Sequence, residues 1–287
     1  MSILRWAAPA LLFCALWPLS CSAEEKADPP KPVATPWTVV KDSGWKELEQ
    51  GLDLREEQLS WKQAGDNSLI LLELKFTAVR IDPRRFGFRI AFNPVEGKRS
   101  LADVARAEKA PVVANGAYFG QKGEPVTLLV SGGKALSKPS AGLPYSGVFS
   151  LDVKGRAAVR KLAEVPPPYE GLDFAVQNSP LLVAGGQPAY PEKPNPSRYR
   201  RTVIGNDAAG RVVLLVCDSS VGLGEMAEIS AAPEAAGGFA LAGAVNLDGG
   251  PSSGLAVEHE KAKVEVKTGP TIPHVIVVAR REKPLPE

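Results

Sequence analysis

Short apolar runs, each closed by glycine, proline or a polar pair, recur along the chain from residue 69 to residue 279. β-rich runs of this length, bounded by turn residues, are typical of strands and not of long helices. Only two segments carry a helical pattern: Ser100–Ala110, with Asp103 three residues after a Ser cap, and 225–238, which breaks near Pro233. The sequence therefore predicts an α+β fold with a large mixed, mostly β sheet and a few covering helices in a single domain. The predicted strands are residues 69–79, 86–92, 112–114, 125–130, 147–153, 157–162, 174–176, 181–183, 202–205, 211–217, 239–247, 254–257, 263–266 and 275–279.

The N-terminal segment carries the pattern of an export signal. Arg5 precedes an apolar stretch, residues 6–19, that is too short to span a bilayer as a stable helix. We predict a signal peptide over residues 1–23, a proline-rich tether over 24–36 and the folded domain over 37–287. Cleavage after Ala23 and lipid attachment at Cys21 remain alternatives. The protein is thus expected to be exported, and to be periplasmic, extracellular or lipid-anchored at the cell envelope, with Cys21 as its only membrane contact.

Charge and composition exclude several classes of partner and cofactor. The 34 Lys and Arg residues and 32 Asp and Glu residues are mixed along the chain, so nucleic acid is not an expected partner. Two histidines and one cysteine outside the export region do not supply a usual zinc site. Cys217 lies in an apolar run and is expected to be a buried core residue, while His259 lies in a polar run and is expected in a solvated turn or edge. No metal or other cofactor is predicted, and no motif supports a divalent cation at the acidic residues.

Four polar segments follow or precede predicted strands, and the longest is Asn246–Gly254. An apolar run delivers Asp248 directly onto two glycines and two serines, and glycines let a backbone approach a ligand closely. The other segments contain Asn115 and Gly116, Ser179, and Arg201 and Thr202. Loops at strand ends often carry functional sites, so we expect these four segments to meet in one pocket.

Taken together, the segments resemble the phosphodiester glycosidase family. The matching stretches are NGAYF at 115–119, RTVIG at 201–205, NLDGGPSS at 246–253 and IPHVIV at 272–277, and the likeness spans roughly residues 69–280. Two departures are visible, because Ala117 and Pro251 each stand where the family pattern has a glycine. Pro251 also removes one backbone donor from the loop. The segment after Asp218 lacks the Gly-Arg pair that often follows this residue in the family.

The resemblance implies a hydrolase that cleaves the glycosidic bond of a sugar-1-phosphodiester, with a phosphorylated sugar or envelope glycan as its partner. It implies Asp248 as the catalytic carboxylate, acting as base or nucleophile, and Asp218 as the second carboxylate. Arg201 would bind the phosphate with its forked guanidinium. The resemblance implies that the remaining candidates bind the substrate. They comprise hydroxyl donors, an amide that would bind the sugar, and glycines that would let the substrate approach the backbone: Asn115, Gly116, Ser179, Thr202, Gly249, Gly250, Ser252 and Ser253.

Structural interpretations of the same residues stay open at this point. Asp248 could only brace the glycine turn, Arg201 could form a surface ion pair, and Tyr118 is favoured as a core residue. Two other functions are alternatives. One is a non-catalytic glycan-binding module at the cell surface. The other is a serine hydrolase that uses Ser252, since residues 250–254 match G-x-S-x-G, although a helix rather than a predicted strand should then follow.

Overall fold

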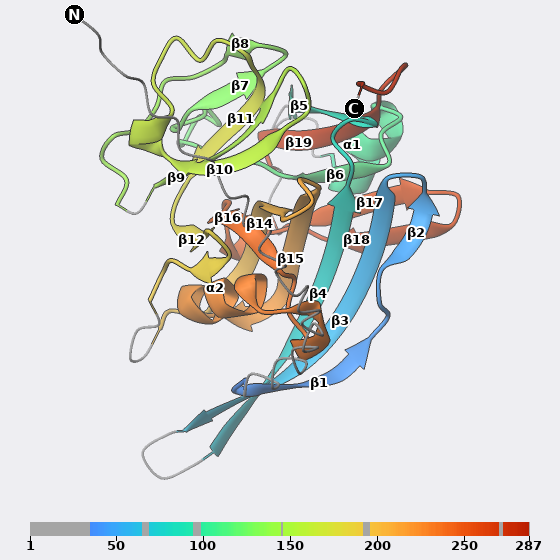
Figure 1. Cartoon of the computed structure of the whole chain (residues 1–287), viewed down its shortest axis with the longest axis vertical. Coiled ribbons are helices and arrows are strands. Elements are labelled where there is room, and N and C mark those ends of the chain that lie inside the picture. Colours follow the sequence, from blue (N-terminus) through green and yellow to red (C-terminus); the bar gives the residue numbers. More distant parts are fainter. Residues whose placement is uncertain are drawn as a thin grey trace, which may run out of the picture. The chain divides into compact units, whose positions relative to one another are not determined.

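Antiparallel strands make up most of the structure, a computed structural model (Figure 1). It describes residues 35–64, 69–93, 99–144, 146–191, 196–269 and 272–286. All of these belong to the second of the two units into which the chain divides, Ala34–Glu287. The predicted signal peptide, with Cys21, and nearly all of the predicted tether lie outside the described residues.

The largest sheet has nine strands in the order β1-β3-β4-β15-β14-β16-β12-β13, with β2 paired to β3. Its two longest strands, β3 and β4, form a hairpin that pairs along thirteen residues. The strands of this sheet are β1 (Trp37–Asp42), β2 (Lys46–Glu49), β3 (Leu52–Ala64), β4 (Leu69–Ile81), β12 (Leu181–Ala184), β13 (Gln187–Pro188), β14 (Tyr199–Asp207), β15 (Val212–Val221) and β16 (Leu241–Asn246).

Two further sheets have five strands each, in the orders β10-β9-β11-β7-β8 and β18-β17-β6-β19-β5. The first contains β7 (Leu129–Ser131), β8 (Lys134–Ala135), β9 (Gly147–Asp152), β10 (Ala157–Lys161) and β11 (Leu172–Asn178). The second contains β5 (Phe86–Phe92), β6 (Val112–Asn115), β17 (Leu255–His259), β18 (Ala262–Val266) and β19 (His274–Arg280). Single 3-10 turns lie at Leu162–Glu164, Glu234–Ala236 and Gly250–Ser252.

The three sheets share one apolar core, in which residues of each sheet contact residues of the others. Val216 and Ile204 of the nine-stranded sheet, Ala114 of β6 and Phe149 of β9 all belong to it. The opposite face of the nine-stranded sheet packs against helix α2 (Leu223–Ala231). Helix α1 (Leu101–Ala107) covers β6, β17 and β19. Within this packing, the end of β6 lies next to the polar segments of β14 and β16, because Asn115 contacts Thr202 and Asp248.

The helix starts follow from their capping residues. The Ser100 hydroxyl accepts a hydrogen bond from the Asp103 N–H at 3.1 Å, and the Asp103 carboxylate accepts one from the Ser100 N–H at 3.0 Å, so the predicted capping box is confirmed. α1 ends at Ala107, earlier than predicted. α2 starts two residues earlier than predicted and stops at Ala231, because Pro233 interrupts the pattern and a separate 3-10 turn follows.

The predicted mostly β, α+β class is confirmed, and the structure refines it. Every pairing between named strands in the described part of the chain is antiparallel, and the strands divide among three sheets, so the predicted mixed pairing is not present there. Strands β1 to β3 were not predicted, since β1 is exposed beyond Trp37 and carries no apolar alternation.

Cys217 is buried as predicted. His259 was expected in solvent, which is wrong: it is 7% exposed and faces Glu49.

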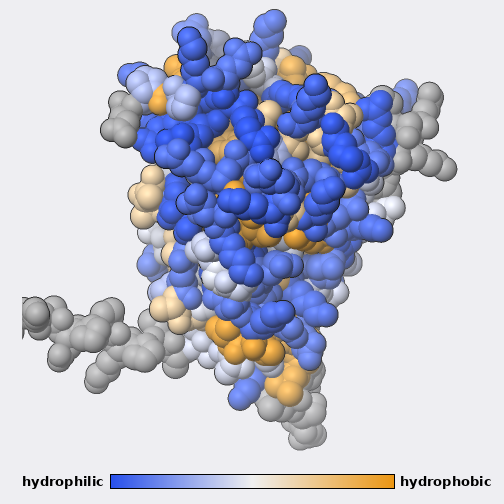
Figure 2. Space-filling model, turned by 90° about the vertical axis from the view of Figure 1, so that its right-hand side faces the viewer, coloured by the Kyte–Doolittle hydropathy of each residue, from blue (hydrophilic) through white to orange (hydrophobic). Residues whose placement is uncertain are grey.

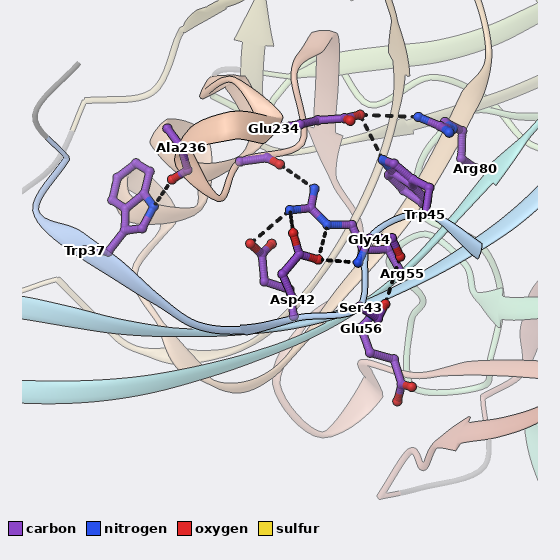
Figure 3. A network of polar contacts seen from close by, with 12 residues as sticks. Trp37, Asp42, Ser43, Gly44, Trp45, Arg55, Glu56, Arg80, Glu234 and Ala236 are labelled. Carbon is purple, nitrogen blue, oxygen red and sulfur yellow. Dashed lines mark hydrogen bonds and ion pairs between the residues drawn. The ribbon is translucent and has the colours of Figure 1, made fainter. Parts of the chain in front are cut away.

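A buried network ties the N-terminal strands to the turn after α2 (Figure 3). Arg55 of β3 is 1% exposed, and its guanidinium donates to both carboxylate oxygens of Asp42 at 2.9 Å. The same group donates to Glu57 at 3.0 Å and to the Gly238 carbonyl at 2.7 Å. Its charge also lies 5.0 Å from the centre of the Phe239 ring. This network holds β1 and β3 to Gly238 and Phe239, which follow the 3-10 turn at Glu234–Ala236.

Figure 2 shows charged and polar side chains over most of one face of the molecule, with apolar patches at the lower end, which carries β1 and the β3–β4 hairpin, and also higher up. Three apolar residues of these strands are exposed: Val39 and Val40 of β1 and Leu71 of β4. Isolated exposed apolar residues are normal on protein surfaces, so this feature identifies no site by itself.

Candidate active site

Asn115, the last residue of β6, joins three of the four polar segments. Its side-chain amide donates to the Asp248 carbonyl at 2.8 Å, and its side-chain oxygen accepts from the Thr202 hydroxyl at 2.7 Å. The same oxygen accepts from the Gly254 N–H at 3.0 Å. Asn115 and Thr202 are both 0% exposed. The structure therefore brings residues 115, 202 and 248 together, and the Asn115 amide is fully occupied by protein groups.

Asp248 follows β16 and lies half-buried on the glycine loop. Its carboxylate accepts a hydrogen bond from the Gly249 N–H at 2.9 Å, and its own N–H donates to the Gly116 carbonyl at 3.3 Å. Burial raises the pKa of Asp248 above the usual aspartate range, while the Ser252 hydroxyl and the Gly249 N–H oppose that rise. A carboxylate with a raised pKa and a partly open environment is suited to a role as base or nucleophile.

Arg201 of β14 is a buried cation without an anionic partner in the described part of the chain. It is 9% exposed, and its hydrogen bonds run only to the carbonyls of Val221 at 3.4 Å and Ser197 at 3.1 Å. Its guanidinium carbon lies 5.4 Å from the centre of the Tyr199 ring. Burial lowers the pKa of Arg201. A desolvated charge left unpaired is costly, and a bound anion would offset that cost.

Arg201 adjoins the loop that carries Asp248. A β-carbon added at Gly249 would lie 3.4 Å from Arg201 Nη1 and 3.3 Å from the Arg200 carbonyl oxygen. Gly249 has a φ of −121°, which any residue can adopt, so close packing and not conformation favours a glycine here. Gly250 has a φ of 60°, which does favour glycine. The backbone of the glycine loop that follows Asp248 thus packs against the guanidinium of Arg201.

Tyr118, for which a core position was favoured from the sequence, is half-buried and lies among the candidate site residues. Its hydroxyl donates to the Ser179 carbonyl at 2.7 Å, and the Asn246 amide donates to the same carbonyl at 3.0 Å. Burial and the negative charge of Asp248 raise the pKa of Tyr118, and the positive charge of Arg201 acts against that rise. Tyr118 therefore lies within the field of both charged groups. The signal for it in the sequence is its place three residues after Asn115.

The remaining loop candidates differ in accessibility. Ser252 is 6% exposed and interacts with Asp248, whereas Ser253 is 0% exposed and its hydroxyl has no partner among the described residues. The Ser179 hydroxyl donates to the Pro144 carbonyl at 2.6 Å, so its carbonyl, and not its hydroxyl, meets the site.

Gly116 packs against His274 of β19. A β-carbon at Gly116 would lie 2.6 Å from His274 Nδ1 and 2.9 Å from its carbonyl oxygen, so any larger residue would displace β19. His274 is 0% exposed, and burial lowers its pKa to about 4. The requirement for glycine at 116 is thus explained by internal packing.

Asp218 lies apart from the other candidates. Arg201 pairs with Cys217 across β14 and β15, so these two side chains share one face of the sheet. Asp218 is the next residue of β15 and points to the opposite face. Its side chain is 52% exposed and forms an ion pair with Arg200 at 2.7 Å. The contacts of Asp218 therefore do not join it to Asp248.

The requirements of a serine hydrolase elbow are not met at Ser252. The G-x-S-x-G match lies on a 3-10 turn, Gly250–Ser252, that leads into strand β17 and not into a helix. His274, the downstream histidine, packs beside Gly116 and forms no hydrogen bond with Ser252 in the described structure.

Among the described residues, no three or more His, Cys, Asp or Glu side chains gather in a way that could hold a metal ion. Cys217 is fully buried, and burial raises its pKa to about 12. In the same part of the chain, no helix has the length and apolar character needed to cross a membrane.

A buried guanidinium without an anionic partner among the described residues, next to the loop that carries a half-buried carboxylate, suits an anionic ligand. The chain belongs to the phosphodiester glycosidase family, because the model of that family matches residues 108–279, more than half of its length. Members of this family are glycosidase-type hydrolases, and this chain is one of them. No curated protein sequence matches the chain.

Two solved structures share the fold. The catalytic domain of zebrafish N-acetylglucosamine-1-phosphodiester alpha-N-acetylglucosaminidase, auto-inhibited by its pro-peptide, has a TM-score of 0.58 and 17% sequence identity. That match covers 79% of this chain and 84% of the zebrafish chain. A hypothetical protein from Synechocystis has a TM-score of 0.54 and 14% identity, covering 86% of this chain and 64% of that protein. At these identities the likeness concerns the fold alone.

Proposed function

We propose that this protein hydrolyses the bond between the anomeric carbon of a sugar and the phosphate of a sugar-1-phosphodiester, with Asp248 as the catalytic carboxylate and Arg201 as the phosphate ligand. The observation that carries the proposal is the guanidinium of Arg201, which is 9% exposed, has no carboxylate partner among the described residues and adjoins Gly249. An anionic substrate would supply the missing charge. The zebrafish relative, by its name, acts on N-acetylglucosamine-1-phosphodiesters, which are therefore the first substrates to test.

The chemistry needs few groups because the leaving group is a phosphate monoester, which is already a stable anion. Departure of this group requires less proton donation than departure of an ordinary sugar alcohol. Arg201 would hold two phosphate oxygens and stabilise the charge that develops there. Asp248 would either attack the anomeric carbon or activate a water, and both roles need its ionised form. Asp218 would not share this step, since its side chain pairs with Arg200 on the other face of the sheet.

The other candidates would position these two groups or contact the sugar. Asn115 and Thr202 would fix the Asp248 backbone through their buried hydrogen bonds rather than bind substrate. Gly116 would maintain the packing against β19 that sets the Asn115 position. The groups left to meet the substrate are the Ser252 hydroxyl, the backbone of Gly249 and Gly250 and the Tyr118 ring, while Ser179 and Ser253 would support the loop from behind.

We further propose that the substrate is a phosphorylated glycan met after export, with residues 1–23 as the signal peptide and Cys21 as the alternative anchoring residue. The support for this part is the export pattern of the sequence, with Arg5 before an apolar stretch. No metal or other cofactor is required by the proposed reaction.

Substitution of Asp248 by Asn tests the proposal, because it removes the charge and keeps the size and the acceptor for the Gly249 N–H. We expect D248N to lower kcat for methyl N-acetylglucosamine-1-phosphodiester by about 10²–10⁴-fold. Asp218→Asn is the matched control and should keep the wild-type rate. In the wild type, activity should fall as the pH drops through a pKa above the ordinary value of 3.8, since burial raises the pKa of the essential carboxylate.

A folded D248N protein with wild-type kcat would remove Asp248 from the mechanism. Equal losses in D218N and D248N would instead make Asp218 the second carboxylate. Wild-type protein that turns over no sugar-1-phosphodiester would reject the proposed function itself.

A further inference from the structure

A cavity of about 660 Å³ lies beyond the end of β14 that is opposite to Arg201. Three turns and two residues near the C-terminus line it: residues 82–84 after β4, 153–157 between β9 and β10, 209–211 between β14 and β15, and Leu285 with Pro286. Most of β14 separates Arg201 from this cavity, a distance of about 20 Å at the usual rise of a strand. The cavity is therefore distinct from the candidate active site.

Two of these turns share the sequence pattern Asp-x-x-Gly-Arg, at residues 152–156 and 207–211. In each turn, the aspartate carboxylate accepts hydrogen bonds from the backbone N–H groups two and four residues later, at 2.9 to 3.0 Å. The same carboxylate accepts a hydrogen bond from the arginine Nε, at 2.6 Å from Arg156 and at 2.7 Å from Arg211. Each turn thus holds one arginine side chain in a fixed position next to the cavity.

The terminal nitrogens of these two arginines remain available to a ligand. The hydrogen bonds of Arg156 and Arg211 run through Nε, and their Nη atoms have no hydrogen-bond partner among the described residues. A guanidinium held at Nε has already lost much of its rotamer freedom, so it binds a ligand at a smaller entropic cost. Both arginines are therefore preorganised donors for an oxyanion.

The lining of the cavity carries more positive than negative charge. Four cations and one carboxylate line it: Arg84, Lys154, Arg156, Arg211 and Asp82. Asp152 and Asp207 do not line the cavity, and their carboxylates are hydrogen-bonded to the backbone of their own turns. Even when these two are counted, four cations face three carboxylates. The placement of the donors and the remaining charge both favour an anionic ligand.

Backbone contacts fix the turns relative to one another. A β-carbon added at Gly155 would lie 3.1 Å from Leu285 Cδ1 and 3.2 Å from the Pro83 carbonyl oxygen, so the β9–β10 turn packs directly on the other two segments. The Leu285 N–H donates to the Arg84 carbonyl at 2.8 Å. β4 pairs with β15 up to the start of the third turn. The cationic side chains therefore come from a rigid frame.

We propose that this cavity binds a ligand that carries two or more phosphate groups. The two Nη atoms of a guanidinium match two oxygens of one phosphate, and Arg156 and Arg211 present such pairs from different turns. A ligand with two phosphates uses both arginines, whereas a single phosphate uses one. The volume lies within the usual range for small-molecule pockets. A free diphosphate and a short stretch of a polymer joined by phosphodiesters share this chemistry.

Calorimetric titration with inorganic pyrophosphate tests the site. The titration uses the Arg201→Ala protein, which lacks the phosphate ligand proposed for the active site, so that binding reports on the cavity. In this background, R156Q and R211Q together should weaken pyrophosphate binding about tenfold or more, because charge-assisted hydrogen bonds are lost. Both side chains are well exposed, at 76% and 41%, so the fold should tolerate the change. Lys154→Gln should weaken binding about threefold by an independent substitution.

Arg106→Gln is the matched control, because its side chain is 56% exposed and ion-paired but lies outside the cavity lining. It should leave pyrophosphate binding unchanged. Equal affinities in R106Q and in the R156Q/R211Q variant would overturn the site, as would no binding of pyrophosphate or of poly(glycerol phosphate).

Poly(glycerol phosphate) is the second probe, and it distinguishes the two sources of the ligand. Tighter binding of this polymer, per pair of phosphates, would support the site and identify a phosphodiester polymer as its ligand. Tighter binding of pyrophosphate would support the site and identify a free diphosphate. Both titrations measure binding and not turnover, so their outcomes leave the proposed function of the active site unaffected.

Discussion

The two arginines that are buried in the described part of the chain, Arg55 and Arg201, have opposite surroundings. Arg55 is 1% exposed and meets two carboxylates, a carbonyl and an aromatic ring (Figure 3). Arg201 is 9% exposed and meets two carbonyls and an aromatic ring, with no carboxylate among the described residues. Both side chains lose their hydration on folding, yet only Arg55 has its charge balanced within the protein.

This difference predicts a structural role for Arg55 and a functional role for Arg201. Removal of one member of a balanced buried cluster leaves the other charges uncompensated, so Arg55 should matter for stability. An unbalanced buried cation lowers stability in the free protein and raises affinity for an anion, so Arg201 should matter for turnover. The two arginines are similar in how little of each is exposed. They differ in whether the groups that they contact carry a negative charge.

Substitution of Arg55 by Ala should have the largest effect on stability. We expect a loss of about 3–5 kcal/mol in the free energy of unfolding, because the buried carboxyl group of Glu57 and the partly exposed one of Asp42 would lose their cation. Urea unfolding followed by tryptophan fluorescence measures the loss. Arg156→Ala is the matched control: its side chain is 76% exposed and pairs with Asp152 on the surface, so its removal should cost less than about 1 kcal/mol. Similar losses in the two variants would show that the Arg55 network contributes little.

Substitution of Arg201 by Ala should reverse this pattern. We expect kcat/KM for a sugar-1-phosphodiester to fall about 10²–10³-fold, as when one preorganised donor to a developing charge is removed. The free energy of unfolding should stay within about 1 kcal/mol of the wild-type value or rise, since an unpaired buried charge is removed. Steady-state kinetics and urea unfolding of the same preparation check both parts. A loss of stability as large as that of R55A, with unchanged kinetics for the folded fraction, would make Arg201 a structural residue.

The sequence identified the segments of the site because polar residues directly after apolar runs are visible without a structure. Asn115, Arg201 and Asp248 are each predicted at a strand end, and the structure brings their segments together. The sequence alone does not show which group each of these side chains contacts. The Asn115 amide is occupied by Thr202 and Asp248, which lie more than 80 positions away in the sequence. Arg201 bonds only to nearby carbonyls, and that it lacks an anion among the described residues is visible only in the structure.

Asp218 shows why strand boundaries limit such predictions. The predicted strand 211–217 ends before the Asp-Ser-Ser run, yet β15 continues through that run to Val221. An exposed face tolerates polar residues within a strand, so polarity does not mark its end. One further residue of strand reverses the direction of a side chain. The same reasoning explains why β1, with five exposed residues of six, was not predicted.

Substitution of Glu57 by Gln sharpens the comparison through the pH dependence of stability. Burial raises the pKa of Glu57 to about 8 against the attraction of Arg55, so the folded protein holds a proton there that the unfolded chain releases near 4.5. The stabilisation from this proton is complete below pH 4.5 and is lost as the pH rises toward 8, by at most about 1.4 kcal/mol per pH unit. E57Q does not titrate, so its stability should fall less than that of the wild type between pH 5 and pH 8.

The result bears on how the charge of Arg55 is balanced. If Glu57 is neutral at pH 7, the cluster contains one cation, Arg55, and one anion, Asp42. Their charges then balance without a third. The lowered pKa of Asp42 does not obscure the measurement, because its contribution is lost only at pH values below 3.8 and is common to both proteins. Parallel stability curves for wild type and E57Q between pH 5 and pH 8 would mean that Glu57 is ionised and that the cluster carries a net negative charge. Arg55 would then be over-balanced rather than balanced, which would widen the contrast with Arg201.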